Sequence, residues 1–425
     1  MELKPGYKQT EVGVIPEDWE VKSLGQIMEY IKGFPFKADD YQSNGIRVLR
    51  VSDTTYDGIR EGGGIYIDEK KAKSCLKWSL KEGDLIVSTV GSKPPMYSSM
   101  VGKVTFIQAR DSGSLLNQNA VILRGRSSSI AIQRVLHNHF RQGRYLKYIE
   151  KIFRGNANQA SITLRELLEY RIPFTPFGAE QEAIAEALSD ADALIESLEQ
   201  LIAKKRQIKQ GAMQELLTGK KRLPGFSGEW EVVKAEDIGC FRGGSGFPSK
   251  FQGVTDAEFP FFKVSDMNNI DNKIFMETAN NYISETQRKH LGATAFPINS
   301  IVIAKVGAAI FLERKRILDK PSCLDNNMAA FTFDLARANC RFIHYLFLNM
   351  RFGDFVSTTA LPSLSGNVLS AIELVLPSCD EQTAITEILS DMDSEIDAME
   401  VKLVKVLRIK KGMMYSLLTG KIRFI

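Results

Sequence analysis

The strongest constraint on this chain is an internal repeat. Residues Glu180–Leu223 align without gaps with residues Glu381–Phe424 at a constant offset of 201 positions, and 22 of the 44 aligned residues are identical. The segment Leu216–Lys220 recurs letter for letter as Leu417–Lys421. Because chance does not give half identity over so long a stretch, we infer that the chain contains two copies of one module.

The repeat extends upstream in a weaker form. Trp19–Val21 corresponds to Trp230–Val232, and Leu85–Gly91 corresponds to Ile301–Gly307, each an apolar run that ends in Val-Gly. The offset drifts between 204 and 216 along such matches, so insertions and deletions separate them. A repeated framework therefore carries loops that differ between the two copies.

The repeated tails are predicted to be long helices. Neither Ala179–Gln210 nor Asp380–Lys411 contains glycine or proline, and both are rich in residues that favour helices. Their apolar residues recur with the four-three spacing of a heptad, which predicts a helix-pair interface. Its members are Ile184, Leu188, Ile195, Leu198 and Ile202 in the first helix, and Ile385, Leu389, Met392, Ile396, Met399 and Leu403 in the second.

Each predicted helix is acidic in its first half and basic in its second. Residues 180–199 hold seven acids and no bases, whereas residues 200–223 hold seven bases and one acid. The second copy has eight acids over 380–400 and seven bases over 401–424. Antiparallel pairing sets opposite charges beside each other, so we predict an intramolecular antiparallel pair. Two independent helices, or pairing with another protein, are the alternatives.

These patterns predict an α+β chain with a pseudo-two-fold internal repeat. Two globular domains of mixed α/β character are expected over residues 1–178 and 219–378, each with a linker segment at its start. Long helices are expected over residues 179–218 and 379–425, the second range including a short C-terminal tail. Joined as an antiparallel coiled coil, the two helices would hold the globular domains at opposite ends of a rod.

The composition is that of an ordinary soluble protein, with 44% apolar and 25% charged residues. Five cysteines show no close Cys-x-x-Cys spacing, which argues against a disulfide framework or a zinc cluster and suits a reducing compartment. The sequence shows neither a signal peptide nor an apolar run of about 18 residues. We therefore expect a cytoplasmic protein without membrane association.

Three features together resemble the specificity subunits of type I restriction-modification systems. They are the N-terminal segment through Ile15–Glu20, the helix starts at Pro176–Gln181 and Pro377–Gln382, and the two Leu-Leu-Thr-Gly-Lys segments that end the helices. The helix starts are of a Pro-x-x-Glu-Gln type, from which both deviate slightly in spacing. The resemblance covers essentially the whole chain. It implies two target-recognition domains, each reading one half of a split, asymmetric sequence in double-stranded DNA, with helices that set the spacer and dock methyltransferase subunits.

The same resemblance implies partners and cofactors. Two methyltransferase (modification) subunits are expected to bind this chain, and restriction/translocase subunits are expected to join through the complex. S-adenosylmethionine, ATP and magnesium are expected on those partner subunits. This chain itself is expected to bind no cofactor and no metal, and to be a non-catalytic subunit.

A search for catalytic motifs finds only partial matches. Ser92–Tyr97 resembles the Asn/Asp-Pro-Pro-Tyr loop of amino-methyltransferases, but Lys93 stands where the amide acceptor belongs, and no G-x-G-x-x-G motif precedes it. His137 and His139 are spaced two apart, so their rings diverge on a helix and a metal site is disfavoured. Two alternatives stay open: a stand-alone DNA adenine methyltransferase with degenerate motifs, and a coiled-coil adaptor without a DNA role.

Loops near strand ends are the predicted DNA-reading positions. Residues 1–179 carry 26 bases and 19 acids, whereas residues 224–379 carry 15 and 16, so the first domain has the clearer charge for binding phosphates. Arg, Lys, Asn and Gln read base edges. The predicted DNA-binding residues are Lys93, Arg154, Asn156, Asn158 and Gln159 in the first domain, and Lys250, Asn268, Asn269, Lys305 and Arg314 in the second. Asn117–Asn119 and Asp325–Asn327 occur in both copies and are interpreted as framework.

Overall fold

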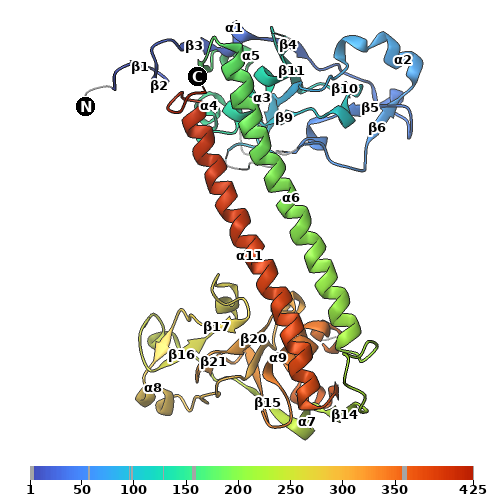
Figure 1. The fold of residues 1–425 in the computed structure, drawn as a ribbon, viewed down its shortest axis with the longest axis vertical. Coiled ribbons are helices and arrows are strands. Elements are labelled where there is room, and N and C mark those ends of the chain that lie inside the picture. Colours follow the sequence, from blue (N-terminus) through green and yellow to red (C-terminus); the bar gives the residue numbers. More distant parts are fainter. Residues whose placement is uncertain are drawn as a thin grey trace. The chain divides into compact units, whose positions relative to one another are not determined.

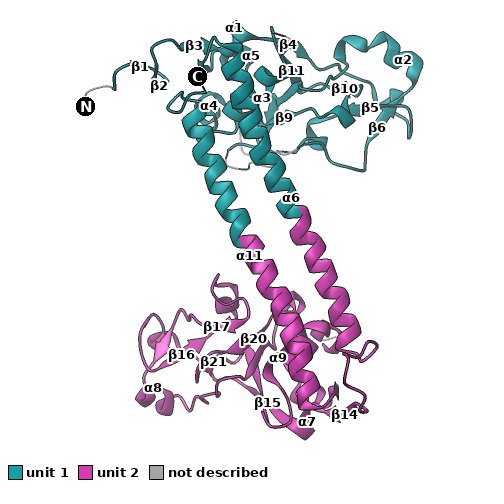
Figure 2. Ribbon diagram, in the orientation of Figure 1, with its two compact units in different colours: residues 1–199, 401–425 teal, residues 200–400 magenta. Residues whose placement is uncertain are grey.

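The computed structural model describes residues 4–55, 58–94, 96, 99–127, 129–155, 159–356 and 361–424. The chain divides into two compact units, coloured separately in Figure 2. Unit 1 comprises Met1–Glu199 together with Val401–Ile425, and unit 2 comprises Gln200–Glu400. Each unit therefore contains one globular domain and parts of two long helices.

The globular domain of unit 1 is built around a four-stranded antiparallel sheet with the order β4-β11-β7-β9 (Figure 1). Its strands are β4 (Met28–Lys32), β11 (Ala120–Gly125), β7 (Leu85–Ser88) and β9 (Val104–Phe106). All four residues of β7 are buried: Leu85 and Val87 join one apolar cluster, and Ile86 joins another. A continuous apolar run is what a strand covered on both faces requires.

Smaller sheets and helices complete unit 1. A three-stranded sheet has the order β10-β5-β6, and three further strand pairs are β12 with β8, β13 with β3 and β1 with β2. Their bounds are β1 (Tyr7–Thr10), β2 (Gly13–Pro16), β3 (Glu20–Ser23), β5 (Ile46–Leu49), β6 (Ile65–Ile67), β8 (Val90–Gly91), β10 (Leu115–Leu116), β12 (Ala160–Ser161) and β13 (Arg171–Phe174). The helices are α1 (Leu24–Ile27), α2 (Glu69–Ser74), α3 (Ile130–Phe140), α4 (Gly143–Ile152) and α5 (Leu164–Leu168), with 3-10 turns η1 (Ala38–Asp40), η2 (Val51–Asp53), η3 (Leu76–Trp78) and η4 (Ala109–Asp111).

The globular domain of unit 2 repeats this topology. Its main sheet has the order β15-β22-β19-β20-β17, so that β15, β22, β19 and β20 stand where β4, β11, β7 and β9 stand in unit 1. The sheet β18-β16-β21 and the pair β14-β23 repeat the smaller sheets. The bounds are β14 (Glu231–Lys234), β15 (Gly239–Gly243), β16 (Phe259–Phe262), β17 (Phe275–Met276), β18 (Tyr282–Ile283), β19 (Ile301–Ala304), β20 (Lys315–Leu318), β21 (Cys323–Leu324), β22 (Met328–Phe333) and β23 (Glu373–Leu376).

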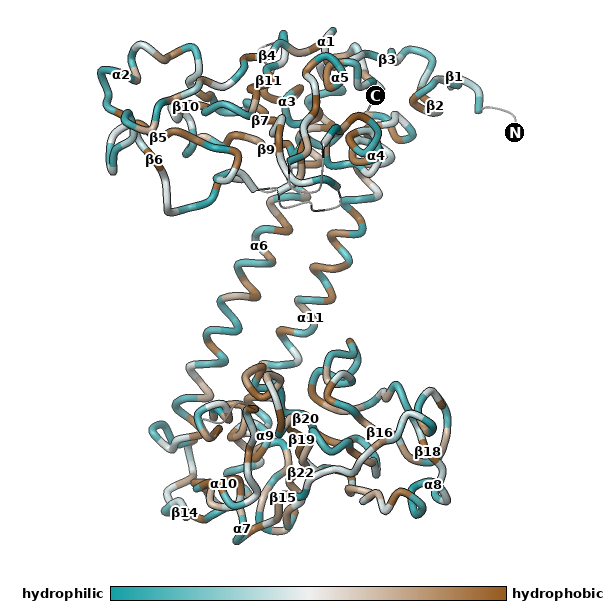
Figure 3. The backbone as a smooth tube through the Cα atoms, turned by 180° about the vertical axis from the view of Figure 1, so that it is seen from behind, coloured by the Kyte–Doolittle hydropathy of each residue, from teal (hydrophilic) through white to brown (hydrophobic). Residues whose placement is uncertain are grey.

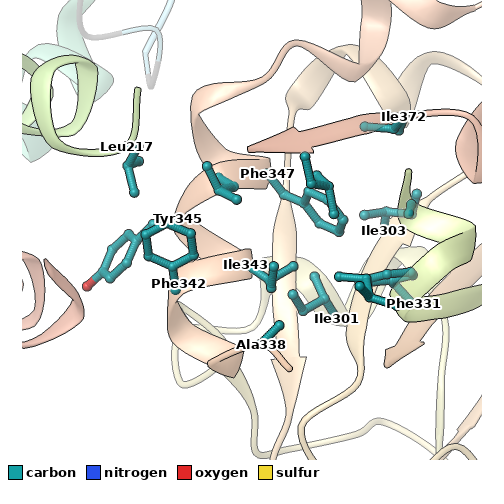
Figure 4. Packing of buried hydrophobic residues seen from close by; sticks show 14 of the residues in the cluster. Leu217, Ile301, Ile303, Phe331, Ala338, Phe342, Ile343, Tyr345, Phe347 and Ile372 are labelled. Atoms are coloured by element: carbon teal, nitrogen blue, oxygen red, sulfur yellow. The ribbon is translucent and has the colours of Figure 1, made fainter. Parts of the chain in front are cut away.

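The helices of unit 2 repeat in part, because the 3-10 turn η8 stands where α4 stands in unit 1. They are α7 (Ala235–Ile238), α8 (Glu285–His290), α9 (Cys340–Asn349) and α10 (Gly366–Ser370), with 3-10 turns η5 (Ser249–Phe251), η6 (Val264–Asn268), η7 (Ala308–Leu312) and η8 (Phe352–Phe355). The core forms where α9 packs on the sheet (Figure 4). There Phe347 of α9 lies near Ile303 and against Phe331 of the sheet, with ring centroids 5.6 Å apart, and Phe342 and Leu217 belong to the same cluster.

Two helices of 39 residues each follow the globular domains: α6 (Gly178–Leu216) and α11 (Cys379–Leu417). They begin beside the predicted domain boundaries. The division between the two compact units lies elsewhere, within each long helix, between Glu199 and Gln200 and between Glu400 and Val401. Hydrophobic and hydrophilic residues alternate along both (Figure 3). Each helix is followed by a glycine in the left-handed region, Gly219 (φ 68) and Gly420 (φ 67), which is the usual conformation just past a helix end.

Within each unit the helix segments run antiparallel, as the charge pattern predicts. In unit 1, Ile184 and Leu188 share a buried cluster with Leu417 and Leu418, while Asp192, further along α6, forms an ion pair with Lys410. In unit 2, Met213 of α6 and Leu217 just after it share a cluster with Ile385 and Leu389 of α11, while Lys209 pairs with Asp393. These two ion pairs are equivalent positions of the repeat.

The predicted seam residues all lie at buried or half-buried positions. Ile184, Leu188, Leu198, Ile202, Ile385, Leu389 and Ile396 are buried, and Ile195, Met392, Met399 and Leu403 are half-buried. A two-helix seam covers each apolar side chain from one side only, so intermediate burial is expected between the packed ends.

Candidate nucleic-acid interface

The connection between β7 and β9 in unit 1 contains the predicted residue Lys93. Strand β7 ends at Ser88 and the chain continues into β8, whose Gly91 lies opposite Ala160 of β12. Lys93 follows two residues later and is exposed. The side chains of Ser92 and Ser99 share a hydrogen bond of 2.9 Å that closes the base of this loop. The β7–β9 connection therefore presents a cation at one edge of the main sheet.

The β8–β12 pairing brings a second predicted loop to the same place. Gln159 directly precedes β12 and is exposed. Arg154, on the other side of that loop, is held by a backbone bridge to Ser161 and by an ion pair of 2.8 Å between its Nη2 and Oε1 of Glu166. The predicted residues Asn156 and Asn158 lie outside the described residues. Two loops separated by about sixty residues in the sequence thus meet, which sequence spacing alone did not show.

Lys103 also stands at this edge and was not among the predicted site residues. It directly precedes β9, is buried, and donates a hydrogen bond of 2.5 Å from Nζ to the carbonyl oxygen of Thr54. Burial, reinforced by the charge of Arg60, lowers the pKa of Lys103 to about 8. Its role is to fasten the η2 region to the sheet. Nothing in the sequence shows that Lys103 is buried whereas Lys93 is exposed.

Unit 2 forms the equivalent edge from the β19–β20 connection. Lys305 follows β19 directly, and its backbone N–H donates to the carbonyl of Asn327, 2.8 Å away. Arg314 precedes β20 and donates a hydrogen bond to the side-chain oxygen of Asn268, at the end of η6. Three of the predicted residues, Lys305, Arg314 and Asn268, are therefore brought together at one edge of the sheet.

The other two predicted residues of unit 2 are placed differently. Asn269 is half-buried, and its amide group donates to the carbonyl of Thr278 and to Asn280, each at 3.4 Å. Lys250 is exposed on η5, with its ammonium 4.9 Å from the centre of the Phe251 ring, beside α8 rather than in the β19–β20 connection. Asn269 therefore serves the local fold, and Lys250 is available to a ligand.

The repeated asparagine turns belong to the framework. Asn117 is buried and its amide donates to the Tyr41 hydroxyl at 3.0 Å; Asp325, its counterpart, is buried and accepts from the backbone of Asn327. Gly33 passes so close that a Cβ there would lie 1.9 Å from the Asn117 carbonyl oxygen. Gly244 makes the same approach to Asp325, at 2.1 Å. Each glycine is therefore required where two strands cross.

The start of each long helix is held by a buried carboxylate. In unit 2, Glu381 accepts two hydrogen bonds of 2.7 Å from Arg222 and a third, of 3.2 Å, from the indole of Trp230. In unit 1, Glu180 accepts from Arg423 and, at 3.1 Å, from Trp19. We call each set a helix-start clasp. The sequence signal was present in the repeated Glu-Gln and Gly-Lys-x-Arg, but was not interpreted as a contact.

The outer faces of the long helices carry exposed apolar side chains as well as charges. In unit 1 these include Leu194, Val401, Val404, Leu407 and Ile409, and in unit 2 they include Leu201 and Ile208. At two positions where unit 1 has Leu194 and Leu407, the repeat gives unit 2 Glu395 and Arg206, which form ion pairs with Lys205 and Glu400. The repeated helices therefore have a common seam but different outer surfaces.

The histidines of α3 are part of the core. Burial lowers the pKa of both His137 and His139 to about 3, so both are neutral at physiological pH. Among the residues that the structure describes, no group of three or more His, Cys, Asp or Glu side chains is placed to hold a metal ion. No helix in the described part of the chain is long and apolar enough to cross a membrane.

Comparison with known proteins also finds the repeated domain and helix organisation. The family model for the type I restriction modification DNA specificity domain matches twice, over residues 16–208 and 227–408. A type I restriction enzyme specificity subunit of Methanocaldococcus jannaschii, MjaX, is 26% identical over 98% of this chain and 96% of its own length. The MjaVIII specificity subunit of the same organism is 24% identical over 96% of this chain and 94% of its own length.

Two solved structures share the fold. The S subunit of a type I restriction-modification system from M. genitalium has a TM-score of 0.59 and 16% identity, with 98% of each chain covered. A chain from a structural study of assembly and conformational transition in a type I R-M system has a TM-score of 0.55 and 12% identity, covering 96% of this chain and 99% of that one. With two matched domains that span most of its length, this chain belongs to the family of type I restriction-modification specificity subunits.

Proposed function

We propose that each globular domain reads one half of a split, asymmetric target in double-stranded DNA. The observation that carries this proposal is the contrast at the sheet edges: the same strands end there in both units, but the loops that follow differ. Lys93, Arg154 and Gln159 gather at that edge in unit 1, and Lys305, Arg314 and Asn268 gather there in unit 2. Different side chains on one framework read different base edges.

Phosphate contacts would position each domain before bases are read. The first domain has the larger excess of basic residues, so we expect it to contribute more of the salt-dependent affinity. Arg154 is exposed and its partner Glu166 is a surface carboxylate, so a phosphate can replace that ion pair at little cost. In unit 2, the predicted residue Lys250 adds an exposed cation outside the sheet edge.

The long helices are proposed to set the spacer between half-sites and to dock two methyltransferase subunits. Exposed apolar residues such as Val401, Val404 and Leu407 support docking, because a helix face that only met water would not favour them. Restriction/translocase subunits would join through the methyltransferase subunits.

We further propose that this chain is a non-catalytic subunit that binds no cofactor itself. S-adenosylmethionine, ATP and magnesium would bind to the partner subunits. Support comes from the residues that could have carried chemistry: Lys93 occupies the acceptor position of the methyltransferase-like loop, His139 is buried and His137 is half-buried. Purified chain that binds or consumes S-adenosylmethionine would instead favour a stand-alone methyltransferase.

Methylation mapping of the source cell with and without this gene tests the proposal. The expected result is the loss of one split motif with a fixed spacer when the gene is deleted. An unchanged methylome together with no DNA binding by the assembled complex would favour the adaptor alternative.

Helix length offers a second test. Inserting one heptad into both α6 and α11 keeps the seam in register and lengthens each helix by about 10.5 Å. We expect the spacer to grow by about three base pairs, at 3.4 Å per pair, while both half-sites stay the same. A matched variant with seven residues inserted in the exposed segment Gly225–Gly228 should leave the spacer unchanged.

A further inference from the structure

The β19–β20 connection of unit 2 exposes two adjacent large apolar side chains. Phe311 is 56% exposed and Leu312 is 57% exposed, both in the last turn of η7. Single exposed apolar residues are common on protein surfaces and need no explanation. A Phe-Leu pair in a connection that already contains predicted DNA-binding residues is a more specific feature.

The pair is held in place rather than loosely attached. Gly307 (φ 80) and Glu313 (φ 52), which flank η7, both adopt positive φ, a conformation that is costly for a glutamate. The Glu313 carboxylate offsets that cost by accepting hydrogen bonds from the backbone N–H groups of Phe352 and Gly353, at 3.0 and 2.8 Å. The buried ammonium of Lys315 pairs with the same carboxylate.

Contacts with η8 fix the direction of the aromatic ring. A Cβ atom at Gly353 would lie 2.9 Å from Cδ1 of Phe311, so the ring rests directly against that glycine. The backbone N–H of Gly307 donates to the carbonyl of Pro362, 2.8 Å away, and ties the other end of the connection to the following segment. The exposed pair is therefore presented by a turn that is braced at both ends.

Polar groups suited to DNA surround this turn. Lys305 precedes it in the connection, and Arg314, hydrogen-bonded to Asn268, follows it. Unit 1 has an exposed apolar residue in its equivalent β7–β9 connection, where Met96 is 52% exposed and lies three residues after Lys93. In both units an apolar side chain thus accompanies a cation at the same edge of the main sheet.

We propose that Phe311 and Leu312 make an apolar contact with the bases of the half-site read by unit 2. This inference rests on the proposed function and adds a class of contact to it. Base pairs offer apolar surface in two forms, the thymine methyl group in the major groove and the faces of a partly unstacked step. A rigid turn that carries two apolar side chains between cations fits either form.

A protein partner is the competing occupant of this surface. A partner that docks on both units would meet the residues that the repeat keeps, such as the seam and the helix-start clasps. The β19–β20 connection is instead a place where the copies differ: Phe311 and Leu312 have no Phe-Leu counterpart in the β7–β9 connection. The flanking Lys305 and Arg314 complement phosphates. Duplex DNA is therefore the occupant that these observations favour.

The test uses the full-length chain assembled with its methyltransferase subunits, and duplexes carrying the split motif found by methylation mapping. Phe311→Ala and Leu312→Ala should each weaken binding about tenfold or more, in line with the worth of a base contact. Ile298→Ala is the matched control, because Ile298 is 51% exposed but precedes β19, at the opposite end of that strand. Phe311→Leu should restore part of the affinity.

Two duplex probes distinguish the two forms of base contact. Uracil in place of thymine removes the methyl group and should weaken wild-type binding but not Leu312→Ala binding if the methyl group is the partner. A 2-aminopurine that brightens with wild-type protein but not with Phe311→Ala identifies an unstacked step. Either result supports the proposal.

Two results would overturn it. If both alanine variants bind DNA at the wild-type level, the proposed base contact is refuted, while the proposed reading of a split motif is unaffected. If the Phe311→Ala or Leu312→Ala complex loses its methyltransferase subunits during purification without DNA, Phe311 and Leu312 belong to a protein interface instead. A wild-type complex that binds no split motif refutes the proposed function itself, and is recognised because the Ile298→Ala complex then also fails.

Discussion

Arg222 and Glu381 form a two-pronged ion pair, with Nε and Nη2 of the arginine each 2.7 Å from one carboxylate oxygen. The repeat reproduces it as Arg423 and Glu180, and in each case a tryptophan indole donates to the same carboxylate. Each clasp joins the start of one long helix to the segment that follows the other. It therefore fixes helix pairing and domain position in a single set of contacts.

Replacing Glu381 with alanine should destabilise unit 2. The change removes a buried carboxylate that accepts from both the Arg222 guanidinium and the Trp230 indole, which are themselves only half-buried. Urea unfolding monitored by tryptophan fluorescence measures the effect. Glu387→Ala, an exposed position on the same helix, is the control. Equal unfolding midpoints for the two variants would contradict the role of the clasp.

Alanine at the two post-helix glycines should have unequal effects. Gly219 and Gly420 have the same positive φ, so each substitution costs about 1 kcal/mol in backbone strain. A Cβ at Gly420 would also lie 2.5 Å from Pro16, whereas at Gly219 the nearest atom, in Trp230, is 3.4 Å away. We expect Gly420→Ala to lower the melting temperature more than Gly219→Ala. The reverse order in differential scanning calorimetry would show that the Pro16 contact relaxes freely.

Acid should destabilise the chain through its buried histidines. Burial lowers the pKa of His137, His139 and His344 from 6.5 to about 3. Below pH 6.5 the unfolded chain therefore binds protons that the folded chain does not, and stability falls by about 1.4 kcal/mol per pH unit for each buried imidazole. Stability is fully regained above pH 6.5.

His344→Gln tests this linkage, because glutamine keeps a donor for the Lys315 carbonyl that His344 now contacts at 3.0 Å. The slope of unfolding free energy against pH, between pH 5.5 and 4.5, should decrease by the amount that corresponds to about one bound proton. His290→Gln, at an exposed histidine, should leave the slope as in the wild type. An unaltered slope in His344→Gln would mean that the imidazole is protonated in the folded chain.

Two substitutions in unit 1 should separate phosphate contacts from base contacts. Lys93→Ala should weaken binding of all sequences and reduce the salt dependence by about one phosphate contact, whereas Gln159→Ala should relax specificity in one half-site only. Lys81→Ala is the matched control, since Lys81 is exposed but precedes β7, at the opposite end of that strand from Lys93. If Lys93→Ala and Lys81→Ala weaken DNA binding equally, Lys93 is not part of the DNA interface.

Much of the fold could be predicted because its signals are local or repeated. The charge halves predicted the antiparallel direction found within each unit, the heptad positions from Ile184 to Leu403 are buried or half-buried, and the apolar run Leu85–Val87 forms most of β7. The order of strands in each sheet was not predictable, because it depends on which distant segments exchange hydrogen bonds. Nothing in the spacing of β15 and β22 shows that they are neighbours.

The candidate site was predictable in composition but not in assembly. Loops rich in lysine and amide side chains drew attention to Lys93 and Gln159, but only the β8–β12 pairing shows that the segments beside them are neighbours. Asn269 and Lys103 illustrate the limit, because burial and local hydrogen bonds, which decide whether a polar side chain is available, depend on the tertiary structure. Nothing in the sequence marks Phe311 and Leu312 as exposed, although both are exposed in the structure.

The composition of the two units has a kinetic consequence during synthesis. Unit 2 is one continuous stretch of chain, whereas unit 1 joins residues that are up to 413 positions apart, as in the hydrogen bond from the Tyr7 hydroxyl to the carbonyl of Gly420. Chains emerge from the ribosome N-terminus first, so the domain that is made first must wait longest for its last contacts. Unit 2 should acquire protection from hydrogen exchange in stalled nascent chains before unit 1 does. The first domain of the sequence is then the last to close, and Glu180 stays without its arginine until Arg423 is free to reach it.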